Sequence, residues 1–164
     1  MKPIDVTPAD YTQMVDLFNG ETDRGAAVLA GSYVENFLGI FLRSCMVDAS
    51  LSDKIFGSNG ALSTFAQRID FAQAFGFLPK PLCDDLHLIR KIRNHFAHHP
   101  KEAAFTASPV REWTALLHAA TVVTTTSDGI TFRLDDARTA YLVSVGMVMI
   151  LANNKLHGFG NPEV

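Results

Sequence analysis

The sequence PLCDDLHLIRKIRNHFAHH at residues 81–99 is the stretch that indicates the fold most clearly. On a helical wheel with about 100° per residue, its apolar side chains fall on one arc. The residues on this arc are Leu82, Leu86, Ile89, Ile92 and Phe96. Pro81 suits the first turn of a helix, and Pro100 disfavours a helical conformation at the residue before it. The stretch therefore predicts an amphipathic helix that starts at Pro81, ends near 97–99 and turns one face toward a core.

The basic residues of this helix do not share one environment. Arg90 and Lys91 fall on the polar side and predict a solvated face, whereas Arg93 falls in the middle of the apolar arc. A buried guanidinium without a partner is costly, so an acceptor should lie near Arg93. Glu35 is the best candidate, because the helix that contains it is apolar on most sides and has no other acid after Asp23. Two interpretations stay open: a structural Glu35–Arg93 ion pair, or an arginine held at an interface or cleft to bind an anion.

The rest of the chain predicts further helices around these two. Helical spacing and capping residues indicate helices at about 8–19, 22–46, 62–75 and 108–120, and a last one from Asp135 or Asp136 to about His157. Residues 48–63 are rich in Ser, Gly and Asn, which is typical of a loop. Residues 122–134 have strand-like composition around Asp128-Gly129, and both a small β-hairpin and an extended connection stay open. We expect an all-α fold: a single-domain bundle of about six helices over residues 1–164.

Composition and charge narrow the function classes. Hydrophobic residues make up 48% of the 164 residues and charged residues 19%, as in a folded domain with a sizeable core. The net charge of −3 argues against non-specific coating of nucleic acid, which rests on neutralising many phosphates. The N-terminus has no apolar signal region, and the longest apolar run, at 140–152, is shorter than the roughly 20 residues that span a bilayer. We expect a cytoplasmic protein without a membrane segment, and we interpret Cys45 and Cys83 as buried free thiols.

The histidines do not form a metal motif. No HExxH sequence occurs, and the His95–His99 pair would need nearby acids or cysteines to complete a coordination shell. We interpret His98 as an ordinary histidine near a helix C-terminus, where its cationic form suits the helix dipole. The sequence predicts no metal and no cofactor.

The sequence resembles two protein families, and both resemblances include residues of the predicted helix that starts at Pro81. Residues 93–98, Arg-Asn-His-Phe-Ala-His, match the R-N-x-x-x-H form of the motif of HEPN domains (higher eukaryotes and prokaryotes nucleotide-binding). The wider stretch LSTFAQRIDFAQAFGFLPKPLCDDLHLIRKIRNHFAHH, at 62–99, resembles the mannitol operon repressor family, and so does GSYVENFLGIFLRSCM at 31–46. This second likeness covers roughly residues 24–110 and spans two helices and a loop. The HEPN resemblance implies a helical, usually dimeric domain, and many HEPN domains are metal-independent ribonucleases.

The HEPN resemblance implies roles for three residues. His98 would move the proton of a ribose 2′-hydroxyl, Arg93 would stabilise charge on the phosphate, and Asn94 would orient His98 from one turn away. On a regular helix, however, Arg93 and His98 point about 140° apart. Such a site therefore needs the helix to break after about Phe96, or a second subunit that closes a cleft around both residues.

A repressor could act directly on DNA or through another protein. The helices at 62–75 and 81–98 superficially resemble a helix-turn-helix, in which the first residues of the second helix read base edges. Here those residues include Asp84 and Asp85, whose carboxylates would face phosphates. We therefore predict a non-catalytic regulator that works through a protein partner, as a homodimer, without direct operator reading. The alternative is a metal-independent HEPN-type ribonuclease that uses Arg93 and His98, in which case RNA is the substrate.

Overall fold

The structure is a computed structural model that describes residues 8–99, 101, 103–121, 124–125, 131–132 and 136–159. These residues form eight α-helices and one antiparallel pair of two-residue strands, which confirms the predicted all-α class. The elements are α1 (Pro8–Asn19), α2 (Asp23–Ser44), α3 (Ala49–Phe56), α4 (Phe65–Ala74), α5 (Lys80–His98), α6 (Val110–Thr114), α7 (His118–Thr121), β1 (Thr124–Thr125), β2 (Thr131–Phe132) and α8 (Ala137–Phe159).

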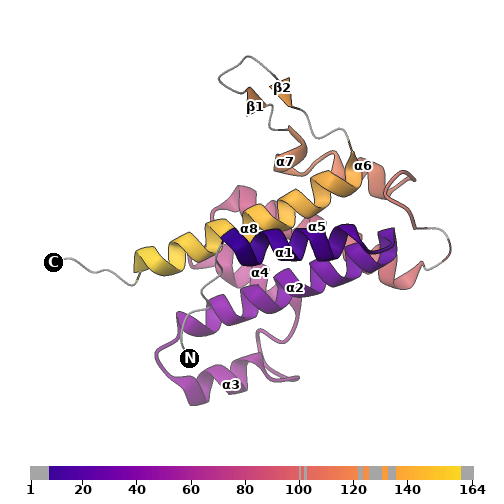
Figure 1. Ribbon diagram of the computed structural model, residues 1–164. Helices are drawn as coiled ribbons and strands as arrows, with labels where there is room; N and C mark the ends of the chain where they lie inside the picture. The colour runs from indigo at the N-terminus through magenta and orange to yellow at the C-terminus, as the bar shows by residue number, and fades with distance from the viewer. Residues whose placement is uncertain are drawn as a thin grey trace.

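Helix α2 lies at the centre of the bundle. The side chain of Thr22 caps it by accepting a hydrogen bond from the amide of Gly25 at 3.1 Å. Helices α8, α5 and α4 pack on it from different sides, and α1 and α3 also contact it (Figure 1). Among the described residues, α2 is the helix whose length and apolar composition could span a membrane, and 56% of its most apolar window is buried inside the fold. Because more than half of this window is buried against other helices, α2 is a core helix of the bundle.

Helix α5 has the predicted amphipathic face. Leu82, Leu86, Ile89, Ile92 and Phe96 are all buried, and they join side chains of α2, α4 and α8 in one hydrophobic cluster. The helix starts at Lys80, directly after Pro79, and stays regular through His98. The predicted boundaries were therefore close at both ends.

The sequence predicts about six helices, whereas the described residues form eight. One reason is that residues 48–63, predicted as a loop, contain a helix. Helix α3 occupies Ala49–Phe56, where the side chain of Asp48 accepts from the amide of Leu51 at 2.9 Å and caps the helix. Phe56 is buried beneath two cations, with the guanidinium carbons of Arg43 and Arg68 at 4.4 and 5.4 Å from its ring centre. A good cap and one anchored aromatic ring thus hold a helix in a segment whose composition is that of a loop.

The predicted helix at 108–120 is also two helices, α6 and α7. The buried carboxylate of Asp85 accepts a hydrogen bond from the amide of His118 at 3.0 Å, and the same oxygen lies 2.9 Å from His118 Nδ1. A side chain of α5 therefore holds the first amide of α7, and a new helix begins there.

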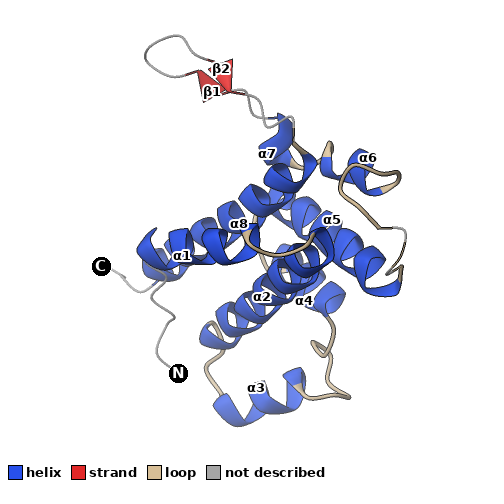
Figure 2. Cartoon of the chain, turned by 45° about the vertical axis from the view of Figure 1, so that its right-hand side comes forward, coloured by secondary structure: helices blue, strands red, loops and turns tan. Residues whose placement is uncertain are grey.

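The segment between α7 and α8 contains a short antiparallel pairing. Thr124 pairs with Phe132 and Thr125 with Thr131, so the hairpin alternative agrees with the residues that the structure describes; the predicted Asp128-Gly129 turn lies outside them. Figures 1 and 2 place the two strands outside the helical bundle, beyond α7. At the start of α8, Asp136 accepts from the amide of Thr139 at 2.7 Å, whereas Asp135 lies outside the described residues.

Candidate functional site

The structure brings Arg93 and Glu35 into contact across α5 and α2. Arg93 Nη2 donates to Glu35 Oε2 at 2.5 Å, and both side chains are about three-quarters buried. The close approach depends on Gly31, because a Cβ at that position would lie 2.8 Å from Arg93 Cβ and Cγ. Next to it, the buried hydroxyl of Tyr141 donates to the Ala27 carbonyl at 2.8 Å. The charge on the apolar arc of α5 is thus held between two helices.

A second arginine reaches the same carboxylate from α4. Arg68 Nη1 lies 4.0 Å from Glu35 Oε1, and Arg68 Nε donates to the Leu62 carbonyl at 3.0 Å. Burial lowers the pKa of Arg68, and the negative charge of Glu35 opposes that shift. Arginine stays protonated at neutral pH, so this Glu35 cluster of Glu35, Arg68 and Arg93 carries a net charge of about +1.

Arg68 was missed from the sequence, although a signal for it exists. It lies in α4 between the buried residues Phe65, Ile69 and Ala72, so it borders the core face of its helix just as Arg93 does in α5. The same wheel argument that singled out Arg93 would have found it.

The structure does not bring His98 to Arg93. His98 is the last residue of α5 and is exposed, and the helix continues unbroken past Phe96. The amide of His99 still donates to the His95 carbonyl at 2.9 Å, as one more helical hydrogen bond. On this regular helix Arg93 and His98 point about 140° apart. The break that a catalytic pair within one chain requires is absent from the described part of α5.

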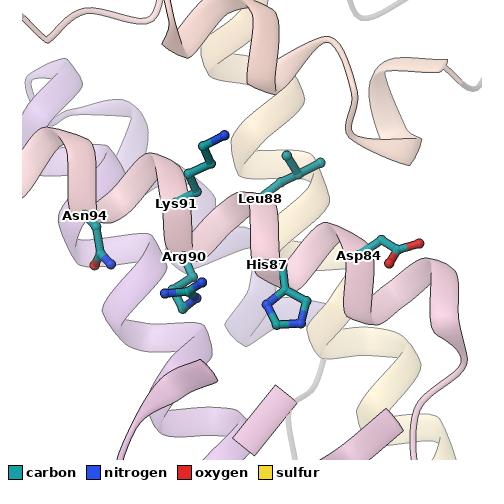
Figure 3. A pocket seen from close by; sticks show the side chains of 6 residues that line it. All are labelled: Asp84, His87, Leu88, Arg90, Lys91 and Asn94. Atoms are coloured by element: carbon teal, nitrogen blue, oxygen red, sulfur yellow. The ribbon is translucent and has the colours of Figure 1, made fainter. Parts of the chain in front are cut away.

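Asn94 forms no hydrogen bond to His98 among the described residues. Its side chain is half-buried and lines an open groove along the outer face of α5. The residues that line this α5 groove are Asp84, His87, Leu88, Arg90, Lys91 and Asn94, and they enclose about 560 Å³. Figure 3 shows His87, Arg90 and Asn94 on one side of the helix and Leu88 and Lys91 on the other.

Arg90 and Lys91 differ, so the prediction of one solvated face was wrong for Arg90. Lys91 is exposed, and its Nζ lies 4.1 Å from the centre of the Trp113 ring. Arg90 is half-buried, and its Nε is shielded from solvent without a hydrogen-bond partner in the described structure. Its position near the edge of the apolar arc allows the stem to fold against the protein.

The remaining histidines have structural contacts. His95 stacks on His99 with ring centres 4.3 Å apart, and its ring is nearly perpendicular to that of Trp113, with ring centres 5.5 Å apart. His87 Nε2 lies 3.2 Å from Asp70. Within the described residues, no group of three His, Cys, Asp or Glu side chains could hold a metal ion.

Both cysteines are free thiols, and their burial differs from the prediction for one of them. Cys83 is fully buried, and burial raises its pKa to about 11, with smaller contributions from Asp84 and Asp70. Cys45 is half-buried, and burial raises its pKa as well.

Comparison with known proteins gives a fold likeness without a family match. No protein-family model and no curated protein sequence matches the chain. The fold is similar to that of one chain in the X-ray structure of the MtlR–HPr complex from Escherichia coli, with a TM-score of 0.68 and 14% sequence identity. The likeness covers 88% of this chain and 99% of that one. At this identity it concerns the fold alone, and it agrees with the resemblance to the mannitol operon repressor family; it gives no support to the HEPN resemblance.

Proposed function

We propose that this protein is a non-catalytic regulator, resembling the mannitol operon repressor family, that acts by binding a partner protein. The observation that carries the proposal is the fold shared along almost its whole length with a chain solved in the complex of MtlR with HPr. The family likeness at 31–46 and 62–99 lies on α2, α4 and α5, three helices that pack together in the core. By this analogy, an HPr-like phosphocarrier protein is the first partner to test.

Charge and position support action through a protein. The first turns of α5 carry Asp84 and Asp85, and Asp85 is buried and occupied with His118. A recognition helix that presents carboxylates to phosphates is unfavourable, and the net charge of −3 adds to this. Direct operator reading is therefore not part of the proposal.

Two observations weigh against the ribonuclease alternative. Arg93 is engaged by Glu35, and His98 lies on another side of an unbroken helix.

The resemblances also imply a homodimer, and we expect a species of twice 17.9 kDa in sedimentation equilibrium. The expected location is the cytoplasm.

Calorimetric titration with Escherichia coli HPr tests the partner directly. We expect saturable binding with one HPr per chain, unaffected by metal chelation. A gel shift with duplexes selected from a random pool at physiological salt is the complementary measurement. Absence of HPr binding together with tight, sequence-specific DNA binding would overturn the proposal.

An RNA-cleavage assay without metal separates the alternative. Wild type and His98→Ala are expected to give the same background on a mixed-sequence RNA. Cleavage by wild type that disappears in His98→Ala would show catalysis and reject the non-catalytic assignment.

A further inference from the structure

The outer face of α5 concentrates positive charge on a negatively charged protein. Of the residues that line the groove on this face, Arg90 and Lys91 are cations, and the acid Asp84 is paired with Lys80. Arg93 points inward to Glu35 and does not belong to this face. The chain as a whole has a net charge of −3. Cations near a helix C-terminus have an ordinary explanation in the helix dipole, but that effect is confined to the last turn. Arg90 is the eleventh of nineteen residues in α5, so the dipole does not account for it.

Arg90 is held in place without an acceptor. Among the described residues, its guanidinium forms no hydrogen bond or ion pair, and its Nε is shielded from water. The Nη groups at the exposed end of the guanidinium can donate charge-assisted hydrogen bonds to a bound carboxylate, whereas the shielded Nε, like that of Arg93, stays without a partner. Because the stem is already folded against the protein, little further ordering is needed when a ligand binds.

The acid that lines the groove, Asp84, already has a cationic partner. Lys80 Nζ lies 2.7 Å from Asp84, and the imidazole of His87 lies 3.2 Å from Asp70. Arg90 and Lys91 are therefore the lining cations that pair with no acid among the described residues, and the Asn94 amide adds donors that form no hydrogen bond in the part of the chain that the structure describes.

The shape of the groove favours an extended ligand over a small ion. Its lining runs from Asp84 to Asn94, about 15 Å along the helix, and the groove is open rather than enclosed. Figure 3 shows these lining side chains spread along α5. Leu88 supplies an apolar contact in the middle. The lining contains no Phe, Tyr or Trp on which a nucleic-acid base could stack, and Lys91 already covers one face of Trp113. These features fit a polypeptide better than a single strand of RNA.

We propose that the α5 groove binds an acidic segment of a partner protein, with a carboxylate on Arg90 and a second one on Lys91. The inference rests on the proposed function, since it assigns a docking surface to a regulator that works through proteins. It adds the chemistry of the contact: acidic side chains spaced along an extended segment, with an apolar residue over Leu88.

The test uses a fluorescein-labelled twelve-residue peptide that repeats Glu-Glu-Leu, followed by fluorescence anisotropy at low and physiological salt. A Lys-Lys-Leu peptide and a twelve-nucleotide RNA serve as the other arms. The variant Arg90→Glu is compared with Lys54→Glu, which makes the same charge change at an exposed position on α3, and with Arg90→Lys. We expect Arg90→Glu to weaken peptide binding about tenfold or more, Arg90→Lys about threefold and Lys54→Glu less than about twofold.

Three results would overturn the inference. They are equal weakening by Arg90→Glu and Lys54→Glu, tighter binding of the RNA than of the acidic peptide, and no acidic-peptide binding by wild type. Thermal melts of each variant verify that the fold is intact, and Arg90→Lys retains the charge if Arg90→Glu proves unstable. If wild type binds HPr in calorimetry but not the acidic peptide, the groove assignment fails while the proposed function stands.

Discussion

Two arginines three residues apart on α5 have opposite surroundings. Arg93 faces inward, where its guanidinium meets Glu35 and its stem lies against Gly31. Arg90 lies at the margin of the core with no acid beside it in the described structure. Arg93 stabilises the fold because its removal would leave the Glu35 carboxylate buried without its main partner. The charge of Arg90, in contrast, is available to a ligand.

Replacing Arg93 should therefore cost more stability than replacing Arg90. Arg93→Ala leaves the Glu35 carboxylate three-quarters buried with only Arg68 nearby, at 4.0 Å. We expect a loss of about 2 kcal/mol in the free energy of unfolding, below the range for fully buried pairs because both side chains are partly exposed. Arg90→Ala should cost less than about 1 kcal/mol. Urea denaturation of both variants measures the difference, and equal midpoints would contradict it.

The buried thiol of Cys83 predicts a dependence on alkaline pH. Its folded-state pKa of about 11 lies above the ordinary value of 9.0, so the fold favours the protonated thiol. This contribution is complete below about pH 9 and is lost as the pH rises through 11. We expect the stability difference between wild type and Cys83→Ala to shrink from pH 8 to pH 11 in urea titrations; a constant difference would refute the effect.

At pH 8 a thiol reagent should modify the half-buried Cys45 before the fully buried Cys83.

The contact between Arg93 and Glu35 could be anticipated because each residue is exceptional in its own helix. One is a cation on an apolar arc, and the other is the only acid past the first turn of a central helix. The burial of Arg90 could not be read in the same way. It depends on how α5 is rotated against the helices that pack on it, and helical periodicity does not contain that angle. The functional role of these residues remains a prediction.

At the scale of elements, α2 presents Gly31, Glu35 and Gly39 along one face, four residues apart. The Arg93 stem packs at Gly31, and the Arg68 guanidinium packs at Gly39. The two glycines thus let cations of α5 and α4 approach the α2 backbone on either side of their shared carboxylate. Their low helix propensity is a cost that the packing of neighbouring helices offsets.

The two glycines should respond differently to alanine. At Gly31 a Cβ would lie 2.8 Å from Arg93 Cβ and the Tyr141 hydroxyl, neither of which can move without shifting a helix. Gly31→Ala should therefore destabilise the fold by about 1–2 kcal/mol despite its better helix propensity. At Gly39 the nearest atom is Arg68 Nη1, at 3.2 Å, the end of a flexible side chain. Gly39→Ala should stay within about 0.5 kcal/mol of wild type, and thermal melts that reverse this order would disprove the packing argument.

The long helices could be predicted from their periodicity, and the short ones could not. Helices α2, α5 and α8 repeat apolar residues over several turns, so their existence and approximate ends follow from the pattern. Helix α3 has only about two turns, and its stability depends on Phe56 reaching Arg43 and Arg68 elsewhere in the fold. The division between α6 and α7 likewise depends on Asp85, more than thirty residues earlier in the sequence.

At the scale of the whole molecule, one hydrophobic cluster connects the helices. Its buried members come from α1 through α6 and α8, including Phe18, Phe41, Ile69, Phe96 and Tyr141. Removing any one helix would expose part of the surface on which the others pack. The helices should consequently lose their structure together.

Calorimetry should show a single cooperative unfolding transition. For 164 residues we expect an enthalpy of about 115 kcal/mol near 60 °C, with the calorimetric and van't Hoff values in agreement when dissociation of any dimer is included. This measurement tests the prediction that residues 1–164 form one domain. Two resolved transitions would divide the chain instead.

Trp113, the only tryptophan of the chain, gives the molecule an intrinsic optical probe. Its indole lies half-buried on α6, with the Lys91 ammonium over its face and the His95 ring nearly perpendicular to it. Both neighbours carry or can acquire charge, so the emission of the indole depends on where they lie. A ligand that draws Lys91 toward itself will change that emission, and occupancy can be followed in the unlabelled protein.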